Sequence, residues 1–316
     1  MPMLPAPPPA QIQTAPASRE VGFPGFNQFP LHGTVLAAEG QPWFAVLVAD
    51  SGPLDRDWVN PMLPDSHGGR ALADWLRAQG VASLRYDKRI HGSRDAKLDT
   101  SLDAQAGDLI AALAAARKLP EARDRRLLLV GHGEGALLAL LDARAADALL
   151  LLGMPPQTMA RSIAAQLRPQ LPADSAGPNL RYLEAVFQAI REHQAPPLAP
   201  AGVFPGMARL GTALMAPETL DFVRATLDID PWPLAARATG PVAMVWGDRD
   251  IQAAKPTLIP PAFHGTVLEI PEANHLLKHE ARPRTELNGA SALAGYGDEV
   301  PLADLKPVAA WIRALP

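Results

Sequence analysis

The chain of 316 residues contains no cysteine. This absence excludes disulfide bonds, a cysteine nucleophile and metal sites built from thiolates. It fits a reducing cytoplasm, which we favour slightly as the compartment. The sequence also lacks an apolar run of the roughly 18–20 residues that a membrane-spanning helix needs. We therefore expect no membrane span, and nothing in the sequence indicates an oligomeric state.

An excess of one charge sign is missing too. Lys and Arg total 29 against 33 Asp and Glu, which gives a formal net charge of −4. A nucleic-acid partner requires a basic surface that neutralises phosphates. We therefore expect no nucleic-acid partner.

The first 17 residues hold a proline-rich string, Pro5–Ala10, without a basic start followed by an apolar core. This is not the architecture of an intact signal peptide. We interpret residues 1–17 as a disordered leader. The alternative is a mature end left after a signal peptide was removed, and the protein would then be periplasmic or secreted.

Strand and helix patterns alternate along most of the chain, which predicts βαβ units and a mostly parallel central sheet flanked by helices. A helical pattern over 302–315 closes the domain. Apolar runs typical of strands cover 28–36, 43–49, 81–86, 127–130, 148–152, 242–246 and 266–270, and helical spacing covers 69–79, 102–119 and 136–146.

The alternation breaks between Met154 and Pro233, where helical segments are separated by proline-rich joints. We interpret 154–233 as a helical cap inserted into a core made of 18–153 and 234–316. Insertions over α/β sheets usually cover the ligand crevice at the strand ends. The alternative is a separate helical domain with no role in a site.

Residues 131–135, Gly-His-Gly-Glu-Gly, join a predicted buried strand to a predicted helix. A strand, a sharp turn and a helix are the context in which a Gly-x-Ser-x-Gly motif presents a nucleophilic serine at positive φ. The middle residue here is Gly133, which cannot attack a carbonyl carbon. The surroundings thus predict an acyl hydrolase, while the central residue excludes its usual covalent step.

Three further segments accompany this turn. Residues 48–57 (Val-Ala-Asp-Ser-Gly-Pro-Leu-Asp-Arg-Asp) and 84–93 (Leu-Arg-Tyr-Asp-Lys-Arg-Ile-His-Gly-Ser) precede it, and Trp-Gly-Asp-Arg-Asp at 246–250 with Ala-Asn-His at 273–275 follows. From about residue 20 onward the chain resembles the α/β-hydrolase superfamily, and within it the lidded carboxylesterases of the EstD-like branch. The resemblance implies the α/β-hydrolase fold with an inserted helical cap, small to medium acyl or aryl esters as substrates, and no cofactor.

The resemblance also implies site roles. His275 would be the general base, and Asp250 would orient and stabilise its imidazole. Asp248 is a second candidate for the acid, and its place in the turn favours Asp250. The backbone N–H groups of Ser51 and Glu134 would form the oxyanion hole, where one donor contributes about 3–4 kcal/mol to the transition state.

Other ionisable residues near these motifs have simpler explanations. We expect His132 to pack beneath the turn rather than act as a base. The acidic residues around Arg56 predict a salt-bridged loop rather than a cation site, so no metal is expected. Asp50 stands where relatives have glycine. Because a carboxylate in the oxyanion hole would oppose catalysis, we expect its side chain to turn away.

The predicted cap is apolar and rich in methionine, which suits an adaptable pocket for acyl or aryl groups. The alternative is that these side chains form the cap's own core. The residues expected to contact substrate are His91, Met154, Phe187, Met207, Met215 and Phe222.

Three interpretations of Gly133 follow. Loss of a triad nucleophile lowers the rate on the order of a million-fold. The favoured interpretation is an inactivated Ser-to-Gly variant of an esterase, in which Gly133→Ser restores hydrolysis. The second is a natural relative that only binds small molecules. In the third, His275 and Asp250 act as a general base on water or substrate in the vacated space, without a covalent intermediate. Dehalogenases and epoxide hydrolases need an aspartate at the turn and are excluded by Gly133.

Overall fold

The computed structural model describes residues 18–59, 63–93, 95 and 97–316. The predicted leader, residues 1–17, lies outside the described residues. An eight-stranded sheet forms the centre, in the order β1-β2-β4-β3-β5-β6-β7-β8. Its strands are β1 (Ser18–Pro24), β2 (Pro30–Leu36), β3 (Trp43–Val48), β4 (Ala82–Tyr86), β5 (Arg126–His132), β6 (Ala148–Leu152), β7 (Val242–Gly247) and β8 (Thr266–Ile270).

The predicted mostly parallel sheet is confirmed. Only β1 and β2 run antiparallel to their neighbours, and all strands from β4 to β8 in the sheet order are parallel. Almost every residue of the inner strands β3, β5 and β7 is buried. Helices that cover both faces account for this, because a parallel sheet is buried on both sides and its strands are therefore almost wholly apolar.

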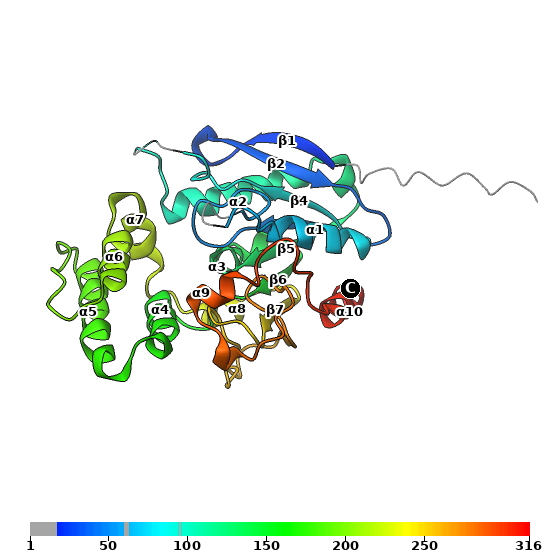
Figure 1. The fold of residues 1–316 in the computed structure, drawn as a ribbon. Coiled ribbons are helices and arrows are strands. Elements are labelled where there is room, and N and C mark those ends of the chain that lie inside the picture. The colour runs from blue at the N-terminus through cyan, green and yellow to red at the C-terminus, as the bar shows by residue number, and fades with distance from the viewer. Residues whose placement is uncertain (1–17, 60–62, 94, 96) are drawn as a thin grey trace, which may run out of the picture.

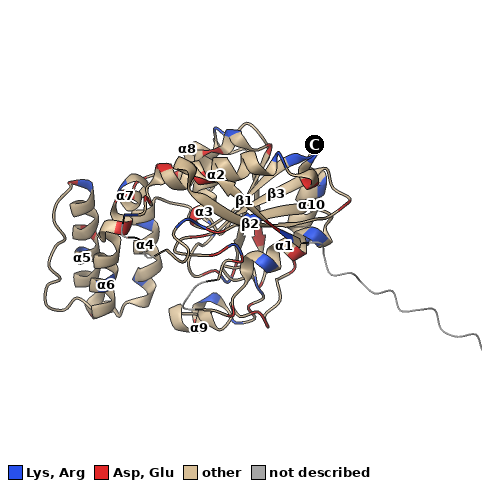
Figure 2. Cartoon of the chain, turned by 90° about the horizontal axis from the view of Figure 1, so that it is seen from above, with Lys and Arg blue, Asp and Glu red and all other residues tan. Residues whose placement is uncertain are grey.

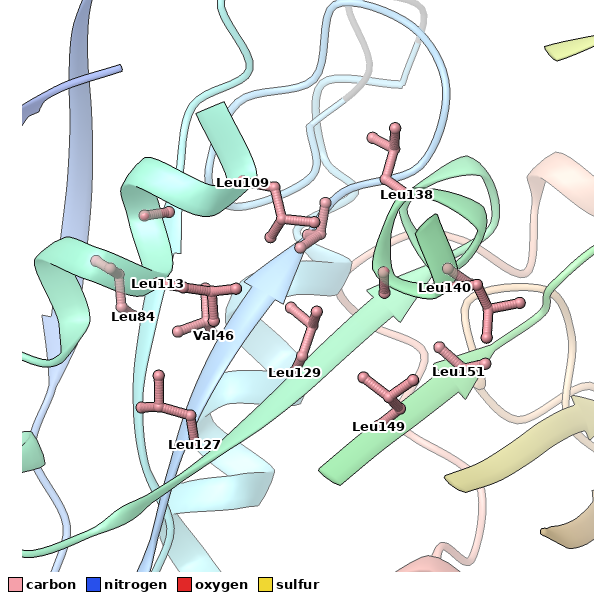
Figure 3. Close-up of a cluster of buried hydrophobic side chains, with 14 of the residues drawn as sticks. Val46, Leu84, Leu109, Leu113, Leu127, Leu129, Leu138, Leu140, Leu149 and Leu151 are labelled. Carbon is pink, nitrogen blue, oxygen red and sulfur yellow. The ribbon is translucent and has the colours of Figure 1, made fainter. Parts of the chain in front are cut away.

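Helices cover both faces of the sheet (Figure 1). The helices α2 (Leu102–Ala116) and α3 (Glu134–Leu141) pack on one face. The helices α1 (Gly68–Ala78) and α10 (Lys306–Ala314) pack on the other. Figure 3 shows Leu109 and Leu113 of α2 and Leu140 of α3 beside leucines and a valine of β3, β4, β5 and β6. This packing fixes the strand ends from which the site loops emerge.

Five helices lie between β6 and β7: α4 (Met159–Leu167), α5 (Ala173–Arg191), α6 (Pro205–Leu214), α7 (Pro217–Thr226) and α8 (Pro231–Ala235). The helices α4 to α7 stand beside the sheet in both views (Figures 1 and 2) and share a hydrophobic core of their own. The short α8 spans the expected boundary at residue 233. It packs on the α/β core, where the Trp232 and Phe263 rings meet edge to face with centroids 5.6 Å apart.

Four helices and strands have no counterpart in the sequence patterns: β1, α6, α8 and the short helix α9 (Gly289–Leu293). The strand β1 has an exposed, polar sequence because it lies at the sheet edge. The helix α6 begins at Pro205 after a proline-rich stretch, and proline is well tolerated in the first turn of a helix. Basic and acidic residues are interspersed over the elements in Figure 2. Among the described helices, none combines the length and apolar character needed to cross a membrane.

The buried leucines of β5 should dominate stability. Leu129 is fully buried between strands and the α2–α3 face. Leu129→Ala is expected to lower the free energy of unfolding by about 2–5 kcal/mol, because it leaves a cavity in a packed core. Urea denaturation measures this change. Leu198→Ala, at a position 94% exposed, should alter it by no more than about 0.5 kcal/mol. Equal losses in the two variants would contradict this packing.

Candidate active site

The loops that follow β3, β5, β7 and β8 meet at the carboxyl edge of the sheet. They carry Asp50, Gly133, Asp250 and His275 respectively. Parallel strands end at the same edge, so residues far apart in sequence come together there. The structure thus brings three of the sequence-predicted positions, Gly133, Asp250 and His275, into one site, together with Asp50.

The turn between β5 and α3 has the predicted sharp geometry. Gly133 has φ +53° and ψ −116°, a conformation that glycine adopts without a side-chain penalty. A Cβ atom on Gly131 would overlap the backbone of Gly135 and Ala136. Strand and helix therefore approach so closely that only a glycine fits at position 131.

His275 and Asp250 form a buried pair. The His275 Nδ1 atom lies 2.7 Å from Asp250 Oδ2, and the side chains are 6% and 1% exposed. Asp250 Oδ1 accepts the backbone N–H groups of Gln252 and Ala253 at 2.7 and 2.9 Å. Of the two candidate aspartates, Asp250 faces the imidazole, whereas the Asp248 carboxylate lies 3.4 Å from an Arg249 guanidinium nitrogen.

The expectation that Asp50 turns away is wrong. Its Oδ1 atom accepts the backbone N–H groups of Ser51 and Glu134, each at 2.7 Å. Its Oδ2 atom lies 3.1 Å from His275 Nε2. The carboxylate thus occupies the two donors that were expected to hold a substrate oxyanion. It also lies at the N-terminus of α3, where the helix dipole favours an anion.

This carboxylate fills the space beside Gly133. A Cβ atom on Gly133 would overlap Asp50 Oδ1 and Cγ. The vacated volume that the sequence suggested for water or substrate is therefore occupied by a side chain of the same protein. A serine at position 133 and an aspartate at position 50, in this geometry, exclude each other.

The pair of Asp50 and His275 is ionised at neutral pH. Burial alone would lower the pKa of His275, but the carboxylates of Asp250 and Asp50 raise it to about 10. Burial alone would raise the pKa of Asp50, but the His275 hydrogen bond, the neighbouring imidazoles of His132 and His275 and the Glu134 N–H hold it below its usual range. At rest His275 is thus an imidazolium between two carboxylates, and it has no lone pair with which to act as a base.

His132 packs beneath the turn. Its ring stacks on Trp58 with centroids 5.1 Å apart, and its Nε2 atom lies 2.8 Å from the His275 carbonyl oxygen. Burial lowers the pKa of its imidazole below the ordinary value. Ligand atoms of Asp50, His132 and His275 lie within 4.8 Å of one another, which is metal-ligand spacing. A cation bound there would compete with the proton that His275 shares with Asp50.

Lys88 is a site residue that the sequence reading missed. Its Nζ atom donates to the Asp50 carbonyl oxygen and to Glu134 Oε1, both at 2.8 Å. It therefore ties the loop after β3 to the start of α3 and fixes Asp50 relative to the turn. The signal available in the sequence was its place in the Tyr-Asp-Lys-Arg segment at 86–89.

The acidic loop after β3 is held by ion pairs to other segments. Arg56 binds Asp87 through two nitrogens, at 3.0 and 2.6 Å, and also pairs with Glu20. Asp57 lies 2.6 Å from Arg85 Nε. The salt-bridged loop was expected, but the partners come from β1, β4 and the loop after β4 rather than from the loop itself.

A cavity of about 610 Å³ opens over Asp50, Gly133 and His275. Phe222 lines it as expected, but the other five predicted contacts do not. Met154 is buried in the core beneath, Phe187, Met207 and Met215 form the core of the helical insertion, and His91 is exposed beside the Pro53 carbonyl. The cavity is also lined by apolar residues that were not predicted from the sequence, namely Leu137, Met159, Ile163, Leu214 and Val223.

Comparisons with known proteins agree with this architecture. No family model matches the chain. It is 25% identical over 241 residues to the esterase EstD of Thermotoga maritima, which covers 72% of this chain and 52% of EstD. The match thus spans about half the length of that relative.

Among solved structures, an esterase of Pyrococcus furiosus superposes with a TM-score of 0.53 at 15% identity, over 83% of this chain and 84% of the esterase. The α/β-hydrolase GrgF of a Penicillium species superposes with a TM-score of 0.50 at 16% identity, over 82% of this chain and 91% of GrgF. The chain therefore has the α/β-hydrolase fold. Position 133, where serine hydrolases of this fold carry the nucleophile, is glycine in this chain, and the Asp50 carboxylate faces it.

The charge state of this site makes the stability of the protein depend on pH. The pKa of His275 is raised, so its stabilising contribution is full below about pH 6.5 and is lost as the pH rises through about 10. The pKa of Asp50 is lowered, so its contribution is present above about pH 4 and is lost as the pH falls further. Asp50→Asn removes one anion beside the imidazole and should therefore lower the pKa of His275.

Nitrogen-15 NMR titration of His275 and urea unfolding between pH 6 and 10.5 measure this shift. Asp304→Asn, which removes an exposed partner of Lys306, serves as the control and should leave the titration unchanged. A His275 titration that is the same in Asp50→Asn and in the parent would refute the ion pair.

Proposed function

We propose that this chain is a hydrolase in which Asp50 has taken the place of the serine of the turn as the nucleophile. The observation that carries the proposal is the position of the Asp50 carboxylate. Its Oδ1 atom binds both oxyanion donors, and it occupies the space where a side chain of residue 133 would begin.

This arrangement speaks against an inactivated serine hydrolase. A Ser-to-Gly exchange by itself would leave a gap at the turn. Here Asp50, from a different loop, fills that gap and is held by three hydrogen-bonding partners. Positions 50 and 133 are therefore complementary, which is what a chain built for a carboxylate at this point requires.

The order of groups supports a reactive role for Asp50. Asp50, His275 and Asp250 form a row in which the central imidazole contacts both carboxylates, at 3.1 and 2.7 Å. A serine triad has the same row, with a hydroxyl in the first place. Aspartate carboxylates are established nucleophiles that form covalent intermediates. His275 can serve as a base once the charge of Asp50 has been consumed.

The size and lining of the cavity fit a small to medium, largely apolar substrate. Its volume of about 610 Å³ falls in the range of small-molecule sites. The walls above Asp50 come from α4, α6 and α7, so the helical insertion acts as a cap over residues 18–153 and 234–316. Because the chain is similar to esterases, an ester is the first substrate to test. A protein that only binds ligands would show no turnover of it.

Four forms of the protein test the proposal: the parent, Gly133→Ser, Asp50→Gly and the double variant. We expect hydrolysis of p-nitrophenyl butyrate, blocked by phenylmethylsulfonyl fluoride, only in the double variant. Asp50→Gly clears the oxyanion hole without supplying a nucleophile, whereas Gly133→Ser alone places a serine against the carboxylate. The double variant should exceed each single variant by at least about a hundred-fold, the value of one oxyanion donor or more.

Circular dichroism confirms that each form is folded before rates are compared. Serine-type hydrolysis in Gly133→Ser alone would mean that the chain is an inactivated esterase. An inert double variant that is folded would mean that the site is not built on the triad geometry. Either result overturns the proposal.

A further inference from the structure

We propose that the substrates are haloalkanes, that is, apolar molecules whose reactive carbon is saturated and carries a halide. This inference rests on the proposed function of Asp50 and adds the kind of atom that it attacks. The geometry that points to it is the unequal use of the two Asp50 oxygens. One is bound by the oxyanion donors, and the other faces His275 at the base of the cavity.

Attack on an ester carbonyl needs free oxyanion donors. The tetrahedral intermediate places a negative charge on the substrate oxygen, and donors 2.7–3.1 Å away stabilise it. The N–H groups of Ser51 and Glu134 already hold Asp50 Oδ1 at 2.7 Å. Displacement at a saturated carbon develops no such oxygen, so it does not require those donors in its first step.

The second oxygen of Asp50, which the oxyanion donors do not bind, is placed for displacement. The Asp50 side chain is 20% exposed and lines the cavity, and Oδ2 is its oxygen on the side of His275. The carboxylate is ionised, as its lowered pKa requires. The sequence-based exclusion of dehalogenases assumed that the aspartate must come from position 133. The loop after β3 delivers the carboxylate to the same place, so that exclusion does not hold.

In the first step, Oδ2 of Asp50 attacks the carbon that bears the halide. A carbon–oxygen bond forms, the carbon–halogen bond breaks, and the halide leaves with the electron pair. Asp50 becomes a neutral alkyl ester. Without the anion at position 50 the pKa of His275 falls, and the imidazolium releases its proton to solvent.

In the second step, water attacks Cγ of the ester and gives a proton to His275. The oxyanion now forms on Oδ1, which Ser51 and Glu134 already hold through their N–H groups. Collapse breaks the bond between Cγ and the alkyl oxygen, and the alcohol leaves with the proton from His275. The regenerated Asp50 carries one oxygen from water and passes its proton to His275. The sum is haloalkane and water to alcohol, halide and a proton.

The cavity lining favours a halide over a strained cyclic ether as the electrophile. A halide leaves as an anion and needs only N–H dipoles, whereas a ring oxygen must receive a proton. Amide side chains of Gln105, Gln157, Gln166 and Gln252 lie in the cavity wall, and the described lining residues include no tyrosine, lysine or arginine. His275 is the one histidine among the described lining residues, and both of its ring nitrogens face carboxylates, Asp250 at 2.7 Å and Asp50 at 3.1 Å, so its protons are directed at these carboxylates rather than at a leaving group.

Trapping of the ester intermediate tests the inference, with 1-bromohexane as the probe. His275→Gln removes the base of the second step, so the intact protein should gain the mass of one hexyl group on the peptide that contains Asp50. Release of hexanol should fall about 10²–10⁴-fold. In the His275→Gln background, Asp304→Asn should keep the adduct and Asp50→Asn should lose it.

Isotope labelling of the parent gives a readout that a structural role for Asp50 would not produce. In a single turnover in H₂¹⁸O, the label should enter the Asp50 carboxylate, and the first hexanol should carry ¹⁶O. Label in the first hexanol with none in Asp50 would mean direct attack by water. Turnover that is lost on chelation with EDTA and restored by Zn²⁺ would mean a metal-bound water. Both results overturn the inference.

Two further outcomes separate this inference from the proposed function. If the double variant Asp50→Gly, Gly133→Ser is an esterase but the parent neither binds nor converts 1-bromohexane, the haloalkane class is wrong and the role of Asp50 stands. An adduct that forms with 1,2-epoxyhexane or p-nitrophenyl butyrate but not with 1-bromohexane likewise overturns the class. Serine-type hydrolysis in Gly133→Ser alone would contradict both the proposed function and the haloalkane inference.

Discussion

The site depends on one carboxylate in an unusual place. Asp50 receives two backbone N–H groups on one oxygen and the His275 imidazolium on the other. This explains why residue 133 is glycine, since any side chain there would overlap the carboxylate. It explains the charge of His275, which lies between two anions. It also gives Lys88 a purpose, because Lys88 bonds the Asp50 carbonyl and the Glu134 carboxylate and so holds both amides in register.

The electrostatics of the site resemble those of a serine triad, except that the anion is present in the resting protein. A serine triad keeps its oxyanion hole empty and stabilises an anion that exists only in the transition state. Here the same donors, at the N-terminus of α3, hold an anion in the ground state. Binding of that kind stabilises the resting protein and adds nothing to catalysis of carbonyl attack, because a donor that is equally satisfied before and during the reaction does not lower the barrier. A reaction that gains from these donors must therefore develop its oxyanion on Asp50 itself.

The sequence predicted the parallel part of the sheet and the positions of the site loops. Buried runs such as 127–130 and 148–152 predicted the parallel strands, because only strands covered on both faces are so uniformly apolar. The order of the motifs predicted which loops would meet. Two features of the site could not be predicted from the sequence. The direction of the Asp50 side chain depends on donors from another loop, which no local pattern encodes. The cap helices are apolar on more than one side, so composition could not tell Phe222, which faces the cavity, from Phe187, which faces the cap core.

The charge of His275 decides the order of events at this site. An imidazolium with a pKa of about 10 cannot accept a proton from water near neutral pH. A reaction that starts with general-base attack by water is therefore disfavoured while Asp50 remains ionised. Conversion of Asp50 to a neutral ester removes the nearest anion on the Nε2 side and leaves Asp250 on the Nδ1 side to orient the ring. In the proposed reaction the first covalent step therefore releases the base, and the charge of a single carboxylate couples the two halves of the reaction.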